Sequence, residues 1–250
     1  MALVLNEEHR LLQDSAREFL GANATVGALR KLRDERDTLG YSPELWQQMA
    51  ELGWASIILP EAYGGLDFGF TGLGVVMEET GRTLTASPLF ASAVISASVI
   101  LLGGDEQQKN TLLPEIAAGK LTLALALEES HHHRPCHIST TAVAKDGRYV
   151  ISGSKTFVLD GHSADQLLVV ARTGGEQHSS TGLSLFLVNR DASGLEIQRT
   201  IMVDSRNAAN VSFDCVTVEE SARVGELGQA WQVLEPALDR ARVAIAAEMM

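Results

Sequence analysis

The chain has 250 residues, and 45% of them are hydrophobic, so it can bury a sizeable core and does not belong to the disordered class. Its net charge is −12 and Lys and Arg form no cluster, which excludes a basic nucleic-acid-binding face. Cys136 and Cys215 lie in different predicted segments and are expected to be free thiols.

The chain shows no targeting or membrane-spanning pattern. Met1 leads directly into an amphipathic helical pattern, which is not typical of a signal peptide. The longest apolar stretch, residues 86–102, contains serines and Pro88 and is too short and too polar to favour a membrane span. We therefore expect a cytoplasmic protein that does not insert into a membrane.

Helical periodicity dominates the first 120 residues. From Leu3 onward, apolar residues recur at i, i+3, i+4 and i+7, with Asn6 as a suitable N-cap. Pro114 is expected to interrupt the last of these helices. The further helices predicted in this region are 26–37, one that starts after Ser42 and ends near 52, 69–82, 87–102, and one from Asp105 to about Gly119.

At residue 121 the apolar residues begin to alternate with period two, which indicates strands. Gly, Asp, Ser and Asn separate the runs, as in an antiparallel barrel or sandwich. The predicted strands are 121–127, 139–145, 149–159, 166–172, 183–189, 195–199 and 210–218.

After Gly228 the helical period returns and continues to the last residue. One face carries Trp231, Leu234, Leu238, Arg242, Ile245 and Met249, and we expect it to pack against a partner. The predicted fold class is α+β multidomain. Residues 1–120 form an N-terminal all-α domain, residues 121–224 a central antiparallel β domain, and residues 225–250 the first helix of a truncated C-terminal helical domain.

Several segments resemble motifs of the acyl-CoA dehydrogenase family. Residues 59–66 (LPEAYGGL) resemble its P-E-x-Y-G-G loop, and residues 104–119 resemble its G-x-x-x-Q-K…L-P-x-x-A-x-G stretch. Residues 149–155 resemble Y-x-x-x-G-x-K, and residues 238–247 resemble the start of its first C-terminal helix. The motifs follow the family's order and spacing along the whole chain.

The resemblance implies FAD between the β domain and a helical bundle, and an acyl-CoA substrate that is converted to the 2-enoyl-CoA. It also implies an electron-accepting flavoprotein partner and a homo-oligomer of two or four chains. Family members remove the α-proton with a Glu, which is expected here beyond residue 250. Some members carry this base at the position of Ala241, so residues 1–250 alone are not expected to turn over substrate.

The family's flavin-lining loop, T-E-P-G-A-G-S-D, is replaced here by residues 128–134 (EESHHHR). In one interpretation, Arg134 and a histidine supply positive charge for the cofactor; in the other, the loop is a solvated turn without a ligand. A metal site is disfavoured, because adjacent side chains rarely converge on one ion. Its candidate ligands would be His131, His132, His133, Cys136 and His137. The cofactor-binding candidates around this loop are Leu125, Leu127, Glu128, His133 and Arg134.

The second flavin-facing motif, K-x-W-I-T-N-G, matches residues 155–161 (KTFVLDG). Phe157 takes the place of the aromatic side chain that covers one flavin face, or else it packs in the core. Leu159 stands where the family has a Thr whose hydroxyl bonds flavin N5, and a Leu side chain cannot donate that bond.

Two arginines are candidates for substrate binding. Arg242 resembles an Arg near the CoA moiety, or it pairs with Asp239. Arg206 precedes Asn207, where the family's D-T-R-E is replaced by NAAN, and either meets an anionic group or is an exposed loop residue. Glu235 and Glu248 lie at non-matching positions of the last helix and are interpreted as exposed carboxylates.

Three hypotheses for function follow. The first is an FAD-dependent acyl-CoA dehydrogenase. The second is a catalytically silent or flavin-free subunit that supports an active homologous partner, motivated by Leu159 and the altered loop. The third is another flavin reaction on the same scaffold, such as that of an oxidase.

Overall fold

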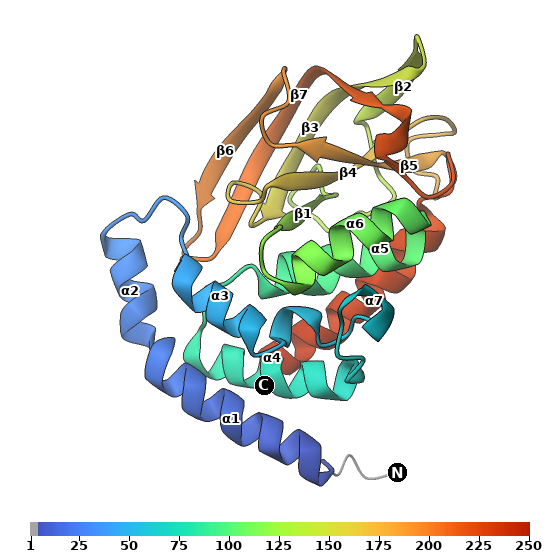
Figure 1. The fold of residues 1–250 in the computed structure, drawn as a ribbon. Helices are drawn as coiled ribbons and strands as arrows, with labels where there is room; N and C mark the ends of the chain where they lie inside the picture. Colours follow the sequence, from blue (N-terminus) through green and yellow to red (C-terminus); the bar gives the residue numbers. More distant parts are fainter. Residues whose placement is uncertain (1–4) are drawn as a thin grey trace.

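The computed structural model describes residues 5–250, and the predicted start of the helical pattern at Leu3 lies outside them. A layer of helices packs against one face of a twisted sheet, and the last helix returns from the sheet to the helical layer (Figure 1). The predicted fold class is therefore confirmed for an all-α N-terminal part, a β-rich middle part and a C-terminal helix.

Four helices begin at a residue whose side chain caps the first turn, and three of these caps, Asn6, Ser42 and Asp105, were predicted. Asn6, Thr25, Ser42 and Asp105 each accept a hydrogen bond from a backbone N–H of the first turn. The helices are α1 (Glu7–Asn23), α2 (Val26–Asp34), α3 (Pro43–Glu51), η1 (Trp54–Ser56), η2 (Glu61–Tyr63), α4 (Gly69–Thr83), the π-helical η3 (Leu89–Ser96), α5 (Ala97–Gly103), α6 (Glu106–Ala117), η4 (Glu220–Ala222) and α7 (Trp231–Glu248).

The predicted interruption at Pro114 is wrong, because α6 continues through it to Ala117. A proline removes one backbone hydrogen bond from a helix. Leu112, Leu113 and Ile116 are buried in the core, so tertiary packing stabilises the helix across that position.

The sheet consists of β1 (Leu123–Ala126), β2 (Thr141–Lys145), β3 (Arg148–Leu159), β4 (Gln166–Arg172), β5 (Leu183–Asn189), β6 (Leu195–Ile201), β7 (Asn207–Glu219) and β8 (Arg223–Val224). Its order is β6-β7-β3-β2-β4-β5-β8, with β1 paired to β4, so it is an open, sandwich-like sheet rather than a closed barrel. Most pairings are antiparallel as predicted, but β1 and β2 each pair with β4 in parallel.

Strand β4 is buried on both faces and separates two hydrophobic clusters. Leu168 and Val170 join the cluster of the helical layer, while Leu167, Val169 and Ala171 point into the cluster enclosed by the folded sheet. The sequence of a strand that is buried on both faces is a continuous apolar run. Residues 167–171 (LLVVA) form such a run.

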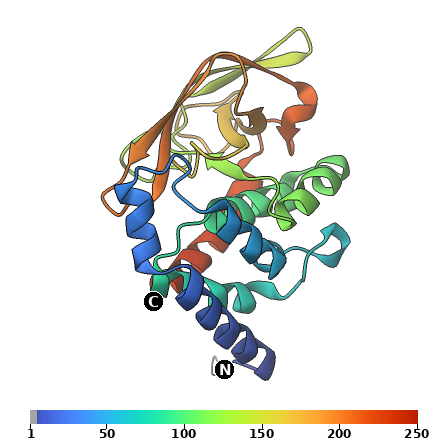
Figure 2. The ribbon, with the colours of Figure 1, turned by 60° about the vertical axis from the view of Figure 1, so that its left-hand side comes forward.

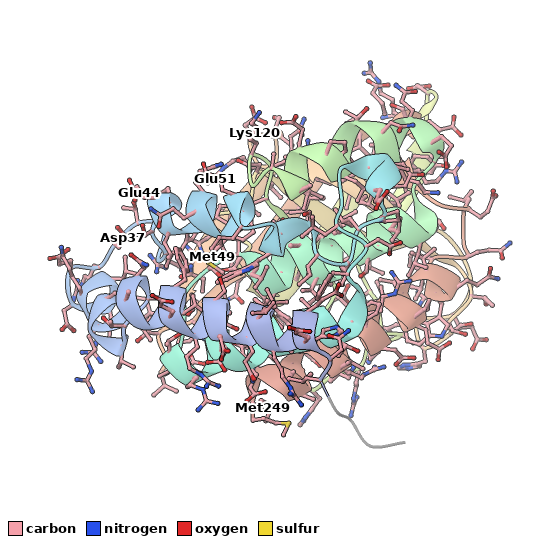
Figure 3. The ribbon with its side chains drawn as sticks, turned by 60° about the horizontal axis from the view of Figure 1, so that its bottom comes forward. Asp37, Glu44, Met49, Glu51, Lys120 and Met249 are labelled. Carbon is pink, nitrogen blue, oxygen red and sulfur yellow. The ribbon has the colours of Figure 1, made fainter. Side chains whose placement is uncertain are left out.

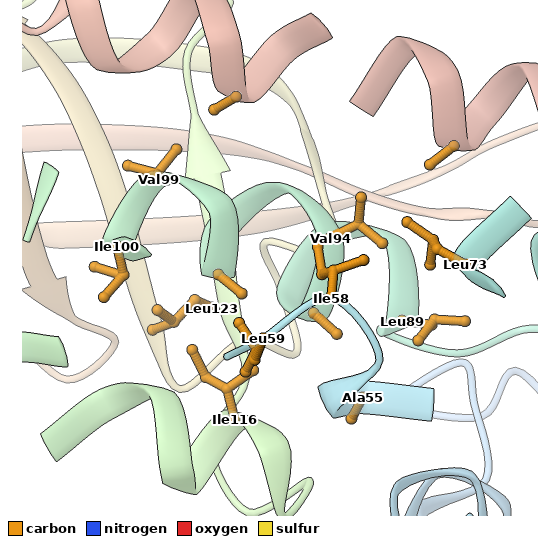
Figure 4. Close-up of a cluster of buried hydrophobic side chains, with 14 of the residues drawn as sticks. Ala55, Ile58, Leu59, Leu73, Leu89, Val94, Val99, Ile100, Ile116 and Leu123 are labelled. Carbon is orange, nitrogen blue, oxygen red and sulfur yellow. The ribbon is translucent and has the colours of Figure 1, made fainter. Parts of the chain in front are cut away.

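The helical layer and the sheet share one core. Leu123 of β1 lies among Leu59, Val99, Ile100 and Ile116 of the helical layer (Figure 4). The backbone N–H of Leu123 also donates to Ser92 Oγ of η3 at 3.1 Å. Continuous packing of this kind makes the two parts dependent on each other for stability.

Helix α7 packs onto α4, η3 and α5 of its own chain. Leu234 and Leu238 are buried there, so the prediction that they pack against a partner is wrong. The other buried residues are the small Ala237, Ala241 and Ala244 rather than Arg242 and Met249. The buried face is thus rotated from the predicted one, because small side chains let α7 approach α4 closely.

The connection between α2 and α3 reaches the ends of β6 and β7 (Figure 2). Arg199 of β6 donates to the carbonyl of Asp37, and Asn207 of β7 donates to the carbonyl of Leu39 at 2.8 Å. In Figure 3, Asp37 and Glu44 lie near each other at one end of the helical layer. Within residues 5–250, no helix is long and apolar enough to cross a membrane.

Replacing Leu168 by Ala should lower the free energy of unfolding by about 2–5 kcal/mol, because the cavity would open in the core shared by both parts. Urea unfolding followed by Trp fluorescence (helical layer) and by far-ultraviolet circular dichroism should still give one transition. Val143→Ala, at an exposed sheet position, is the control and should change the free energy by under about 0.5 kcal/mol. Two separated transitions in the wild type would contradict the shared core.

Candidate functional site

The largest cavity, of about 790 Å³, lies between the helical layer, the ends of β3 and β7, and the last turns of α7. Such a volume is within the range of pockets that hold small molecules. Its lining residues are Gly40, Glu78, Gly81, Arg82, Leu84, Ala86, Ser87, Phe90, Phe157, Leu159, Asp160, Met202, Asp204, Arg206, Asn207, Ala208, Ile245, Glu248, Met249 and Met250.

A β-bulge turns Phe157 into this cavity. The pairing of β3 with β7 is interrupted between Lys155 and Val158, and Phe157 has a φ of 54°. Bulges redirect side chains at functional sites, and a positive φ is unusual for a non-glycine residue. Phe157 is 49% exposed, so the alternative that it packs in the core is excluded. Leu159 lines the same cavity two residues further on.

Asp160 follows Leu159 at the cavity wall, where its backbone N–H donates to the carbonyl of Asn207 at 3.1 Å. Burial raises the pKa of Asp160 to about 7, although the side chain of Asn207 and the charge of Arg206 favour the ionised carboxylate. Asp160 stands where the resembled motif has Asn.

Arg206 lies at the same end of the cavity and connects three parts of the chain. It donates to the carbonyl of Thr85 at 3.2 Å and to Glu248 Oε1 of α7 at 2.6 Å. The side chain of Glu248 is only 10% exposed, so its interpretation as an exposed helix carboxylate is wrong. The close approach of α7 to α4 withdraws it from solvent.

A buried ion pair anchors the loop that follows β1. Lys155 is 0% exposed and donates to Glu129 Oε1 at 2.8 Å and to the carbonyl of Leu127 at 3.1 Å. Burial lowers the pKa of Lys155 to about 8, against the attraction of Glu129. Burial disfavours the charged form of Glu129 too, but Lys155 and two backbone N–H groups outweigh it and hold its pKa below the usual value.

Arg172, at the end of β4, fixes the other end of this loop. Its guanidinium donates to six backbone carbonyls, those of Cys136, Ile138, Gly174, Gln177, Ser179 and Thr181. One cation thus ties the loop after β1 to the loop between β4 and β5. The loop after β1 is therefore ordered by contacts within the chain.

Residues 128–134 satisfy their polar groups internally. The carboxylate of Glu128 contacts His133 Nδ1 at 2.6 Å and accepts from the backbone N–H of Arg134 at 3.2 Å. Ser130 Oγ accepts from the backbone N–H of His132, and the Glu128 carbonyl accepts from the N–H of Thr156. Two N–H groups of the loop, those of His132 and Arg134, therefore bond Ser130 and Glu128 rather than a phosphate.

These residues fit one part of an FAD and not another. Phe157 offers an exposed aromatic face to a flat ring, and Leu159 supplies apolar contact but no donor. The carboxylate of Glu128 already occupies the N–H of Arg134 and contacts the ring of His133, so the loop after β1 does not fit a pyrophosphate there.

The other predicted site residues lie apart from the cavity. Leu125 and Leu127 belong to the strand end before the loop and pack against the helical core. His133 and Arg134 are exposed. Arg242 is 54% exposed and pairs with Asp239 on the outer face of α7. The structure thus brings Phe157, Leu159 and Arg206 together around the cavity.

The described residues, 5–250, contain no group of three or more His, Cys, Asp or Glu that could hold a metal ion. His137 packs its ring against His178, with centroids 4.2 Å apart. Sequence reasoning missed Asp160 and Glu248 as lining residues. The sequence did contain a signal for Asp160, because the resembled motif has Asn at that position. It contained none for Glu248, because the burial of that residue depends on how closely α7 approaches α4.

Comparison with known proteins identifies relatives along the whole chain. Residues 6–120 match the acyl-CoA dehydrogenase N-terminal domain, and residues 125–216 match the acyl-CoA dehydrogenase middle domain. The acyl-CoA dehydrogenase FadE12 of Mycobacterium tuberculosis is 31% identical over 90% of this chain and 58% of its own length. The chain spans about three fifths of the length of the curated relatives that it matches.

Two solved structures are also similar. A variant of the Tcur3481-Tcur3483 steroid ACAD is 33% identical, with a TM-score of 0.82 over 97% of this chain and 62% of that one. The acyl-CoA dehydrogenase of Geobacillus kaustophilus is 28% identical, with a TM-score of 0.85 over 99% of this chain and 66% of that one.

Lys155→Met should lower the free energy of unfolding by about 3–5 kcal/mol, because it leaves Glu129 without its partner in a largely buried site. The double variant Lys155→Met/Glu129→Leu should lose much less, since no charge remains to be desolvated. Urea titration of both variants measures the difference. Lys109→Met, which breaks an exposed pair with Glu106, is the matched control and should cost about 0–1 kcal/mol.

The stability contributed by Asp160 should fall as pH rises. Its folded-state pKa of about 7 lies above the usual 3.8, so the contribution is complete below about pH 4 and is lost through about pH 7. The wild type should therefore lose stability relative to Asp160→Asn between about pH 5 and about pH 8. Urea unfolding midpoints of the wild type and Asp160→Asn, measured at about pH 5 and about pH 8, test this. Asp214→Asn, at an exposed position, is the control substitution. The same stability difference between wild type and Asp160→Asn at both pH values would refute the prediction.

Proposed function

Because the chain belongs to the acyl-CoA dehydrogenase family, we propose that it serves the α,β-dehydrogenation of an acyl-CoA thioester to the 2-enoyl-CoA. The observation that carries this proposal is the cavity of about 790 Å³ between the helical layer, the bulged end of β3 and α7. Apolar side chains of Leu84, Phe90, Leu159 and Ile245 line it, as an acyl chain requires.

The chain's own residues have positioning roles in this proposal. The bulge at Phe157 presents an aromatic face at the cavity wall, and the Lys155–Glu129 pair keeps the bulge beside the loop after β1. The N–H of Thr156 bonds the carbonyl of Glu128 at 2.8 Å and joins the two segments. The acyl group would lie at this corner, against the aromatic face of Phe157.

A second candidate function is that of a flavin-free subunit which supports an active homologous chain. The observation that favours it is the Glu128 carboxylate, which bonds an N–H group that a cofactor phosphate would need, together with Leu159 in place of a hydroxyl donor. The similar steroid ACAD carries a name that joins two proteins, Tcur3481 and Tcur3483. In this arrangement the FAD belongs to the partner, and this chain contributes the acyl cavity or an interface.

The absorbance spectrum and native mass of the full-length protein separate the two arrangements. Purified alone, the protein should lack flavin absorbance, because the loop does not fit a pyrophosphate. Coexpressed with a homologous chain that retains the T-E-P-G-A-G-S-D loop, it should copurify as a yellow assembly that forms enoyl-CoA with an artificial electron acceptor.

Stoichiometric flavin in the protein purified alone would instead support the first arrangement, in which this chain holds the FAD. Yellow preparations that bind no acyl-CoA and form no enoyl-CoA from any chain length would contradict the dehydrogenase proposal in both arrangements.

A further inference from the structure

Four polar residues gather at one end of the cavity. Asp160, Arg206, Asn207 and Glu248 meet there, and we call these four residues the polar end. They come from the end of β3, the start of β7 with the residue before it, and the last turn of α7. The walls elsewhere include the apolar Leu84, Phe90, Phe157, Leu159 and Ile245.

The polar end is fixed in place by contacts behind it. Arg206 is held by the carbonyl of Thr85 and by Glu248 Oε1, and its own backbone N–H bonds Asp204. Asn207 is buried and is held by the carbonyl of Leu39 and by Arg199. These partners leave further N–H groups of Arg206 and the second oxygen of Glu248 available to a ligand.

Asp160 lines the cavity beside Leu159, and among residues 5–250 no salt bridge includes it. The groups that stabilise its ionised carboxylate are the side chain of Asn207 and the charge of Arg206. A carboxyl group at a pocket wall loses hydration when an apolar ligand covers it, unless the ligand returns a hydrogen bond. An unsubstituted alkyl chain returns none.

The sign of the charge decides which part of a ligand enters this end. At this end of the cavity Asp160, Asp204 and Glu248 lie around Arg206, and Glu248 already pairs with it. Acids also match or outnumber arginines over the whole lining, because Glu78 and Arg82 add one of each. The phosphates of a CoA moiety would be repelled here, so the polar end receives the acyl portion of the substrate rather than its nucleotide.

We propose that the cavity selects an acyl group carrying a hydroxyl on the part that reaches the polar end. This inference rests on the proposed function and deepens it by naming the substrate class. The hydroxyl donates to Asp160 or Glu248 and accepts from Arg206. Asp160, Arg206 and Glu248 are then specificity-determining residues, because buried polar groups left unpaired penalise a ligand that lacks the matching atom.

The test compares acyl-CoAs of one carbon number, unsubstituted or carrying a hydroxyl at successive positions towards the chain end. Isothermal titration with the full-length protein measures each dissociation constant. At least one hydroxylated compound should bind the wild type about tenfold more tightly or better, the ratio expected of one added charged hydrogen bond. Asp160→Leu should bring that ratio to about one or below it, whereas Asp214→Leu, an exposed strand position, should leave it unchanged.

Glu248→Met is the second variant, because it retains side-chain length, removes an acceptor and does not change β3. It should reduce the preference several-fold, and thermal unfolding confirms that each variant is folded. Equal binding of unsubstituted and hydroxylated compounds to the wild type would overturn the inference and leave the proposed function intact. A preference that survives in both folded variants would also overturn it, and failure of every acyl-CoA to bind would refute the proposed function as well.

Discussion

The close crossing of α7 over α4 is the constraint on which the cavity depends. A Cβ added to Gly81 would lie 1.9 Å from the carbonyl oxygen of Glu248, so only glycine permits this approach. On the facing helix, the buried side chains of Ala237, Ala241 and Ala244 are also small. The crossing brings the last turn of α7 to the level of the β3 and β7 ends, and Glu248 can therefore meet Arg206 across the two parts of the chain.

Two buried cations of the sheet domain, Lys155 and Arg172, hold its loops in place. Lys155 holds the segment after β1 through Glu129, and Arg172 holds the same segment and its neighbour through six carbonyls. Both cations lie where backbone oxygens would otherwise lack partners. Glu128 completes the set by bonding an N–H group of its own loop. The departures from the family's motif are thus compensated by other side chains.

Much of this architecture could be predicted because local signals and tertiary packing agree. The capping residues Asn6, Ser42 and Asp105 located three helix starts, and apolar runs separated by Gly, Asp, Ser and Asn located the seven longer strands of the sheet. The parallel pairing of β1 with β4 escaped prediction, since strand direction depends on how distant segments meet. The buried face of α7 was not predicted because the periodicity was judged from large side chains, whereas alanines form much of the contact.

For the cavity, Phe157, Leu159 and Arg206 were found by motif position. Glu248 was not, because its burial follows from the glycine at position 81 of another helix.

Strand β6 has only β7 beside it and so forms one edge of the sheet. Such an edge offers a row of unsatisfied backbone groups to any extended chain that approaches it. Glu196 and Arg199 lie along β6, and an incoming strand would have to desolvate both charges without supplying partners for them. The open sheet is therefore guarded against fibril-like self-association at this edge, even though Ile201 and Val203, at its tip, are apolar and almost fully exposed to water.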